Sequence, residues 1–122
     1  MVKLTFCLRK LPDWSREDFQ QYWREVHGAL VARHAPVLGI RRYVQVHTKE
    51  TRMNIALRES RSAMEPFDGV AEVWYDSVGA LAASVSTPEG SAASEELLDD
   101  ERRFIDLTRS CLWMSEEFEL LP

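Results

Sequence analysis

Polar and apolar residues alternate along the start of the chain. One set of alternate positions is apolar and the other is mostly polar: Val2, Leu4, Phe6 and Leu8 against Lys3, Thr5, Cys7 and Arg9. Successive side chains of a strand point to opposite faces of a sheet, so this alternation predicts a half-buried β-strand. Pro12 lacks the N–H that a sheet ladder needs, and we expect it to end the strand.

A helical period follows the first strand. It begins at Ser15, with Asp18 three residues later as a weak capping box. The residues that recur every three or four positions form one stripe: Phe19, Trp23, Val26, Leu30 and His34. This spacing is typical of an amphipathic helix. Proline disfavours helical geometry in the residue before it, so we expect Pro36 to end the helix.

Three further strands and a second helical region are predicted downstream. Strand patterns cover about residues 40–48, 70–75 and 111–120, and helical patterns cover about residues 77–85 and 88–102. The stretch between the second and third strands, residues 49–67, is polar and charged. We expect an extended connection there that carries a short helix and acts as a mobile cover over the mouth of a pocket.

The order of these elements, β-α-β-β-α-β, predicts a ferredoxin-like α+β fold with a four-stranded antiparallel sheet and helices on one face. We expect residues 1–122 to form one domain. In the third strand Val70 and Trp74 share one face, while Ala71, Val73 and Tyr75 share the other. Both faces of the sheet are therefore apolar, and pairing two sheets in a homodimer would cover the second face.

Charge and composition argue against nucleic-acid and membrane partners. The formal net charge is −5 and the basic residues are scattered, so there is no basic footprint for nucleic acid. No apolar run approaches the roughly 20 residues that cross a bilayer. The first residues run directly into a strand, and we expect no cleaved signal and a cytoplasmic protein. Cys7 and Cys111 are then expected to be buried, reduced thiols.

Several segments along almost the whole chain resemble the EthD-domain family of the dimeric α/β-barrel superfamily. The resemblance is carried by KL and LR at 3–4 and 8–9, SREDF at 15–19, YW at 22–23, VHG at 26–28, RYVQ at 42–45, FDGVAEVW at 67–74, DE at 100–101 and FID at 104–106. The family often has an asparagine–histidine pair after the second strand. Here Val46–His47 keeps only the histidine.

The resemblance implies a homodimer with a pocket in each subunit, between the helices and the sheet. The family takes its name from degradation of a tert-butyl ether, where the small protein accompanies an oxygenase system. Similar domains act in polyketide pathways as cofactor-free decarboxylases, dehydratases or cyclases. Other branches of the superfamily are isomerases, quinone-forming monooxygenases and haem proteins, and a haem with one helix histidine as its ligand stays an alternative by fold analogy.

Two histidines lie at the margin of the apolar stripe of the first helix. His27 and His34 are seven residues apart, about 10.5 Å along a helix axis, which is too far for both to bind one metal ion. No HExxH, CxxC or glycine-rich phosphate motif is present. We therefore expect no metal or cofactor. A titratable group beside aromatic residues favours a small-molecule site, although a core histidine bonded to a carbonyl is the alternative.

Glu72 is the second candidate for acid–base chemistry, because it lies in a strand expected at the centre of the sheet. Burial would raise the pKa of its carboxyl group unless a cation, Arg42 or Arg9, meets it, which is the structural alternative. If His27 faces Glu72 across the gap between helix and sheet, the two form a proton-transfer pair. His47, which shares a strand face with Tyr43, is the third catalytic candidate.

Aromatic and polar side chains around the expected pocket are candidates for substrate binding: Phe6, Tyr22, Trp23, His34, Arg42, Tyr43, Trp74 and Trp113. For the tryptophans, core packing is the alternative use. Our first hypothesis is a cofactor-independent lyase or isomerase that decarboxylates, dehydrates or isomerises a hydrophobic, oxygenated metabolite, such as an aromatic or polyketide ring. The rival is a non-catalytic binding or accessory protein that supports an oxygenase or an ether-degradation pathway.

Overall fold

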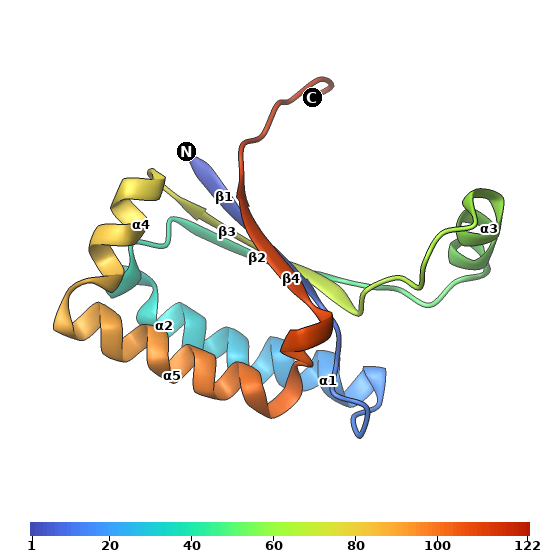
Figure 1. The fold of residues 1–122 in the computed structure, drawn as a ribbon, viewed down its shortest axis with the longest axis horizontal. Helices are drawn as coiled ribbons and strands as arrows, with labels where there is room; N and C mark the ends of the chain where they lie inside the picture. Colours follow the sequence, from blue (N-terminus) through green and yellow to red (C-terminus); the bar gives the residue numbers. More distant parts are fainter.

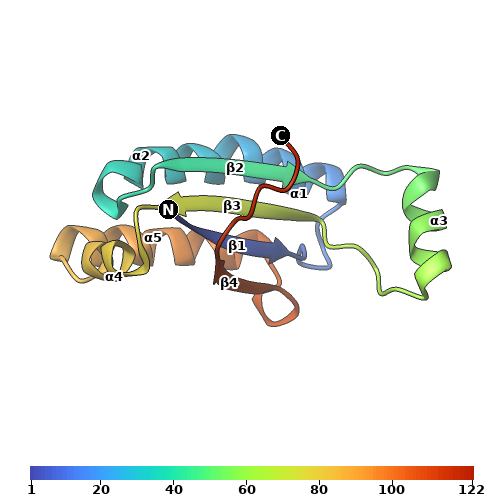
Figure 2. The same cartoon turned by 90° about the horizontal axis from the view of Figure 1, so that it is seen from above.

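A computed structural model describes all residues, 1–122, and its elements follow the order expected from the sequence (Figures 1 and 2). In chain order these elements are β1 (Val2–Leu8), α1 (Arg16–Tyr22), the π-helical turn η1 (Trp23–His27), α2 (Gly28–Leu38), β2 (Arg42–His47), α3 (Arg52–Arg61), β3 (Gly69–Tyr75), α4 (Val78–Val85), α5 (Pro88–Phe104), the short 3₁₀ helix η2 (Leu107–Arg109) and β4 (Cys111–Ser115). No helix combines the length and the apolar composition that crossing a membrane requires.

The four strands form one antiparallel sheet in the order β2-β3-β1-β4. The helices α1, α2 and α5 lie along one face of this sheet, and α4 lies near one end of it (Figure 1). The predicted ferredoxin-like α+β fold is confirmed. The other face of the sheet carries no helix (Figure 1). The sheet therefore has an inner face covered by helices and an uncovered outer face.

The first helical segment is continuous from α1 through η1 to α2. Ser15 caps it as predicted, since its hydroxyl accepts a hydrogen bond of 3.0 Å from the Asp18 N–H. The expectation that Pro36 ends the helix is wrong, because α2 continues to Leu38. Pro36 lies in the last turn, where its missing N–H costs one helical bond, and the left-handed Gly39 (φ 68°) terminates the helix.

The core forms where η1 and α5 meet the centre of the sheet. Trp23, Phe19, Phe104 and Leu8 are the largest fully buried side chains. The ring centroids of Phe19 and Phe104 are 5.4 Å apart, and this contact packs α1 against α5. Gly69 opens β3 directly under Trp23, and any side chain at this glycine would collide with the indole ring.

The connection between β2 and β3 does carry a short helix, α3, but this helix does not cover a pocket. Figures 1 and 2 show α3 beyond the end of the sheet, apart from every other helix. None of its residues is buried. The expected cover over a pocket mouth is therefore wrong for the single chain, because too few apolar residues of the connection can reach the helix–sheet interior.

Two further expectations are corrected at β1 and β4. Cys7 and Cys111 are far apart in sequence but lie directly opposite each other on these strands, and Cys111 is exposed rather than buried. The last strand was expected to run to residue 120 but ends at Ser115. The 116–122 segment then leaves the sheet because Ser115 pairs with Lys3, near the beginning of β1, and the only strand beside β4 ends there.

Candidate functional site

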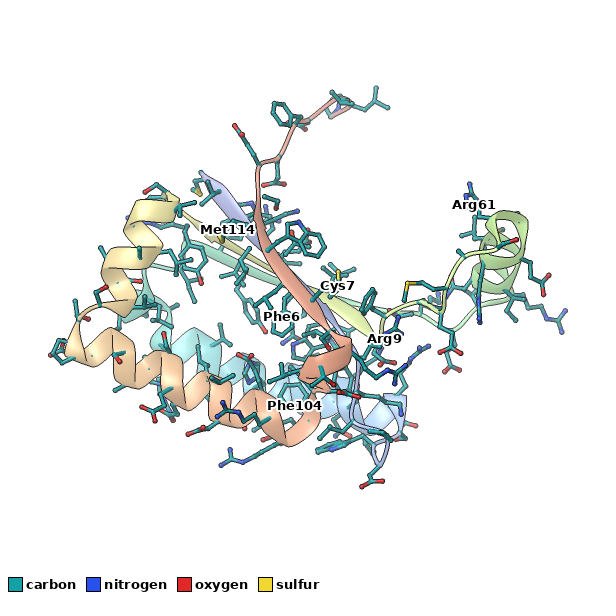
Figure 3. All side chains as sticks on the ribbon, in the orientation of Figure 1. Phe6, Cys7, Arg9, Arg61, Phe104 and Met114 are labelled. Carbon is teal, nitrogen blue, oxygen red and sulfur yellow. The ribbon has the colours of Figure 1, made fainter.

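A cavity of about 170 Å³ lies between the inner face of the sheet and the helices. Most of the side chains around it are apolar, and Phe6 points from β1 into the space between the layers, toward the side on which Phe104 lies (Figure 3). The lining residues come from the inner face of β1–β3 and from η1, α2, α4 and α5: Leu4, Phe6, Leu8, Trp23, His27, Val31, Leu38, Ile40, Tyr43, Ala71, Val73, Tyr75, Leu81, Val85, Ser94, Leu97, Glu101 and Ile105.

His27 reaches this cavity from the π-helical turn. Its Nδ1 lies 2.8 Å from Oδ2 of Asp100, and the imidazole is almost entirely buried. Asp100 also accepts hydrogen bonds from the Tyr22 hydroxyl (2.6 Å) and from Arg103 (2.9 Å). A π-helical turn is common at functional sites because its extra residue re-aims the side chains of the helix. Here both Trp23 and His27 of the turn are buried.

The protonation of this pair follows from its surroundings. Burial acts to raise the pKa of Asp100, but its hydrogen bonds from Tyr22, His27 and Arg103 hold the pKa below the usual range. Burial lowers the pKa of His27, and Asp100 only partly opposes this. Asp100 is therefore ionised and the neutral His27 carries its proton on Nδ1, which leaves a lone pair on Nε2.

The Nε2 atom of His27 has no hydrogen-bond partner in the chain. Its imidazole makes one hydrogen bond, through Nδ1 to Asp100. No fully buried side-chain nitrogen or oxygen in the protein lacks a partner, so the unbonded Nε2 has accessible surface. His27 is also one of the residues that line the cavity. The arrangement is that of a general base oriented by a carboxylate.

Glu101 is the only carboxylate that lines the cavity. Its side chain has no hydrogen bond and no ion pair, although it is partly buried among apolar groups. Burial, and then the negative charge of the adjacent Asp100, raise the pKa of Glu101 to about 7. A carboxyl group with this pKa can hold or release a proton near neutral pH.

Two tyrosines add hydroxyl groups to the cavity wall. Burial raises the pKa of Tyr43 to about 12 and also raises that of Tyr75, so both phenols are neutral. The Tyr43 oxygen accepts a hydrogen bond of 2.7 Å from Gln45, which leaves the Tyr43 proton available to another acceptor. Gln45 also bonds the Trp23 carbonyl oxygen, at 2.8 Å, and so fixes β2 against the π-helical turn.

The predicted pair of His27 and Glu72 is wrong. Ala71 and Val73 line the cavity, so the side chain of Glu72 between them points to the outer face of the sheet. There it forms an ion pair of 2.6 Å with Lys3. A cation does pair with this carboxylate, as the alternative predicted, but it is Lys3 rather than Arg42 or Arg9.

Three of the expected binding residues share that outer face. The Arg42 guanidinium lies 4.7 Å from the centre of the Trp74 ring. Thr5 of β1 lies between Glu72 of β3 and Trp113 of β4, so Trp113 is on the same face as Glu72. None of these three lines the cavity. Their assignment to a helix-side pocket is wrong because even-numbered residues of β2 and β3 point away from the helices, as does Trp113 of β4 opposite Thr5.

The remaining candidates divide between the cavity and its surroundings. Phe6, Trp23 and Tyr43 line the cavity together with His27. Tyr22 lies behind the imidazole, bonded to Asp100. His47 stacks on Trp23, with ring centroids 4.5 Å apart, and bonds Gln45, while His34 bonds Glu96 outside the cavity, at 2.8 Å. The structure thus brings together only part of the predicted set.

Asp100 and Glu101 were not among the predicted site residues. Both fall within the apolar stripe of α5, between Leu97 and Phe104. On a helical wheel each lies within about 60° of Leu97, the direction that faces the sheet. Two acidic residues inside an apolar stripe were the signal, since carboxylates are almost never buried unless they are paired or functional.

The sequence model of the EthD domain matches residues 11–108. A crystal structure of an ethyl tert-butyl ether degradation (EthD) family protein from Bacillus halodurans is 20% identical, with a TM-score of 0.61, over 97% of this chain and 99% of that one. HapK from Hahella chejuensis is 14% identical, with a TM-score of 0.62, over 100% and 97% of the two chains.

A third similar structure is a dimeric protein of unknown function with a ferredoxin-like fold, from Bacteroides fragilis. It is 15% identical, with a TM-score of 0.57, over 95% of both chains. No curated protein matches this chain. At these identities the solved structures bear on the fold alone.

Proposed function

Because this chain belongs to the EthD domain family, whose match spans most of its length, we propose that its cavity binds a hydrophobic, oxygenated small molecule and performs acid–base chemistry on it without a cofactor. The observation that carries the proposal is the pairing of two titratable groups on one apolar cavity. Asp100 orients the neutral His27, and the unpaired Glu101 has a pKa of about 7. Two such groups with different environments suit the roles of base and acid.

The proposed step is abstraction of a proton from a carbon next to a carbonyl group. His27 Nε2 takes the proton and becomes an imidazolium that Asp100 stabilises. The electron pair moves to the carbonyl oxygen, where protonated Glu101 donates a proton and Tyr43 can donate a hydrogen bond. The enol that forms can then return its proton at another carbon, or lose a leaving group, which corresponds to isomerisation or elimination.

The size and lining of the cavity favour an aromatic or similar ring as the ligand. An apolar cavity of about 150 Å³ is enough to hold a benzene-sized ring. The cavity here measures about 170 Å³, and its polar groups are few. We expect one substituted ring to enter, with its oxygen atoms toward His27 and Glu101.

The proposal is tested by exchange of α-protons for deuterium in an aryl ketone such as acetophenone, followed by proton NMR in D₂O. The wild-type protein should accelerate the exchange, and His27→Ala should lose roughly 10²–10⁴ of that acceleration, as expected for a general base. His34→Ala is the matched control, because this imidazole is on the same helical segment but bonds Glu96 outside the cavity.

The same samples test the rival function of a non-catalytic binding protein. Binding of the ketone is read from its line broadening in the NMR spectra. Saturable binding without any acceleration of exchange by the wild type would overturn catalysis and favour the binding protein. Equal acceleration by wild type and His27→Ala would remove His27 from the mechanism.

A further inference from the structure

The helix α3 and the loop after it form an arm, residues 49–67, in which no residue of the helix is buried. The rest of the chain holds the arm at its base, where Arg9 lies over the Phe67 ring. Every residue of α3 is at least partly exposed, and four apolar side chains of the arm are 47–68% exposed: Met53, Ile55, Leu57 and Met64. An isolated helix of this length is marginal in water even with good helix formers. The arm therefore needs a surface against which its apolar side chains can be buried.

The arm carries a groove with an apolar floor and a basic rim. Leu57 and Met64 contribute apolar side chains, and Arg58 and Arg61 contribute guanidinium groups. Neither arginine forms an ion pair within the chain. Their side-chain hydrogen bonds go to groups of the arm itself. The groove is thus suited to an apolar side chain flanked by carboxylates.

A segment with that composition follows β4. Residues 116–122 read EEFELLP, and Phe118, Leu120 and Leu121 are 77–88% exposed. Glu116 and Glu119 form no ion pair within the chain. Glu117 accepts a hydrogen bond from the Trp74 indole and so attaches the segment to the outer face of the sheet.

The arm and the 116–122 segment lie on the same side of the sheet. Figure 1 shows both on the side away from α2 and α5, and Figures 1 and 2 agree that they lie apart from each other. They flank the uncovered outer face, which carries Trp74 and the half-exposed Val46 and Trp113. A second copy of the chain placed over this face would meet both extensions. A similar structure from Bacteroides fragilis is that of a dimeric protein.

In the sheet-to-sheet homodimer that the family resemblance implies, we propose that the arm of each copy binds the 116–122 segment of the other. Leu57 and Met64 receive the apolar side chains of that segment, and Arg58 and Arg61 pair with Glu116 and Glu119. Two-fold symmetry makes this contact twice in each dimer. The arm is then a clasp between subunits.

Charge reversal on either side of the clasp tests the proposal. The arm variant is Arg58→Glu with Arg61→Glu, and the segment variant is Glu116→Lys with Glu119→Lys. Each homodimer then brings like charges together twice, so each variant alone should dimerise at least about tenfold more weakly than wild type. A mixture of the two variants should dimerise as wild type does, because both contacts of the heterodimer pair opposite charges.

Light scattering and sedimentation at micromolar concentration measure these states, with a dimer at twice the 14.1 kDa of one chain. The matched control is Arg24→Glu with Arg109→Glu, two exposed arginines outside the arm, which should dimerise as wild type. Circular dichroism checks that each variant is folded. A monomeric wild type, variants that dimerise like wild type, or a mixture no stronger than its components would each overturn the clasp.

Discussion

At the residue scale, the proposed function depends on how one helix segment places two neighbouring carboxylates. Asp100 is ionised because three donors surround it, and Glu101 is readily protonated because it has none. The two residues are adjacent in sequence, so the difference comes from their surroundings rather than from their chemistry. Asp100 orients His27, and both His27 and Glu101 line the cavity.

Glu101 should make the stability of the protein depend on pH in an unusual direction. Its pKa is raised in the folded state to about 7, so the folded chain binds more protons than the unfolded one between about pH 4.5 and pH 7. This contribution is complete below the unfolded pKa and is lost as the pH rises through about 7. It amounts to about 3 kcal/mol at most. Glu101→Gln should therefore flatten the decline of the unfolding free energy over this range.

Denaturant titrations at pH 5 and pH 8 measure that change, with Glu95→Gln as the control on an exposed face of the same helix. The α-proton exchange of the wild type should also fall above about pH 7, as Glu101 loses its proton. An unchanged pH dependence of stability in Glu101→Gln would show that its carboxyl group titrates normally.

At the scale of elements, the site depends on the contact between η1 and the start of β3. The Trp23 ring lies over Gly69, and the Trp23 carbonyl oxygen accepts hydrogen bonds from Gln45 and from the Gly28 N–H. The latter bond closes the wider π-helical turn that carries His27. The close approach of ring and strand is thus a condition for the position of the imidazole.

Gly69→Ala should lower the free energy of unfolding by about 1–3 kcal/mol, because the new methyl group overpacks the contact with Trp23. Gly79→Ala is the matched control. A methyl group there meets only ordinary van der Waals contact in α4, and alanine should stabilise that helix by about 0.5–1 kcal/mol. Denaturant midpoints measure both changes, and similar midpoints for the two variants would contradict the tight contact at Gly69.

At the scale of the whole molecule, one sheet face is buried under helices and the other carries apolar groups without a cover. The helices α1, α2 and α5 enclose the cavity on the inner face (Figure 1). On the outer face the arm and the 116–122 segment project beyond the sheet without burying their own apolar side chains. Such surface is costly in water, and a second subunit would remove it.

Hydrogen exchange of α3 should therefore depend on protein concentration. In a dilute monomer its amides should exchange almost as quickly as those of an unstructured peptide, since no residue of α3 is buried. At concentrations where the dimer forms, they should be protected at least about tenfold more. Amides of β3, in the centre of the sheet, serve as the internal reference. Rapid exchange of α3 in the fully formed dimer would contradict its burial there.

The sequence by itself determined the order of the elements, the sheet and the family resemblance. Alternation in β1 and β3 and the period of α1 and α2 are local patterns, and they specify which residues form strands and helices. They also identified His27 at the margin of an apolar stripe. Such patterns do not indicate which of two apolar strand faces turns toward the helices.

Tertiary structure alone decided that choice, and with it the site. Packing of α5 on the inner face turned Glu72 away to Lys3 and brought Asp100 to His27, 73 residues away in sequence. The end of α2 is a different case, because the left-handed Gly39 ends that helix locally. The two tertiary choices share one physical reason. Local pattern fixes the backbone of each element, whereas the partner of a side chain depends on long-range packing that buries the most apolar surface.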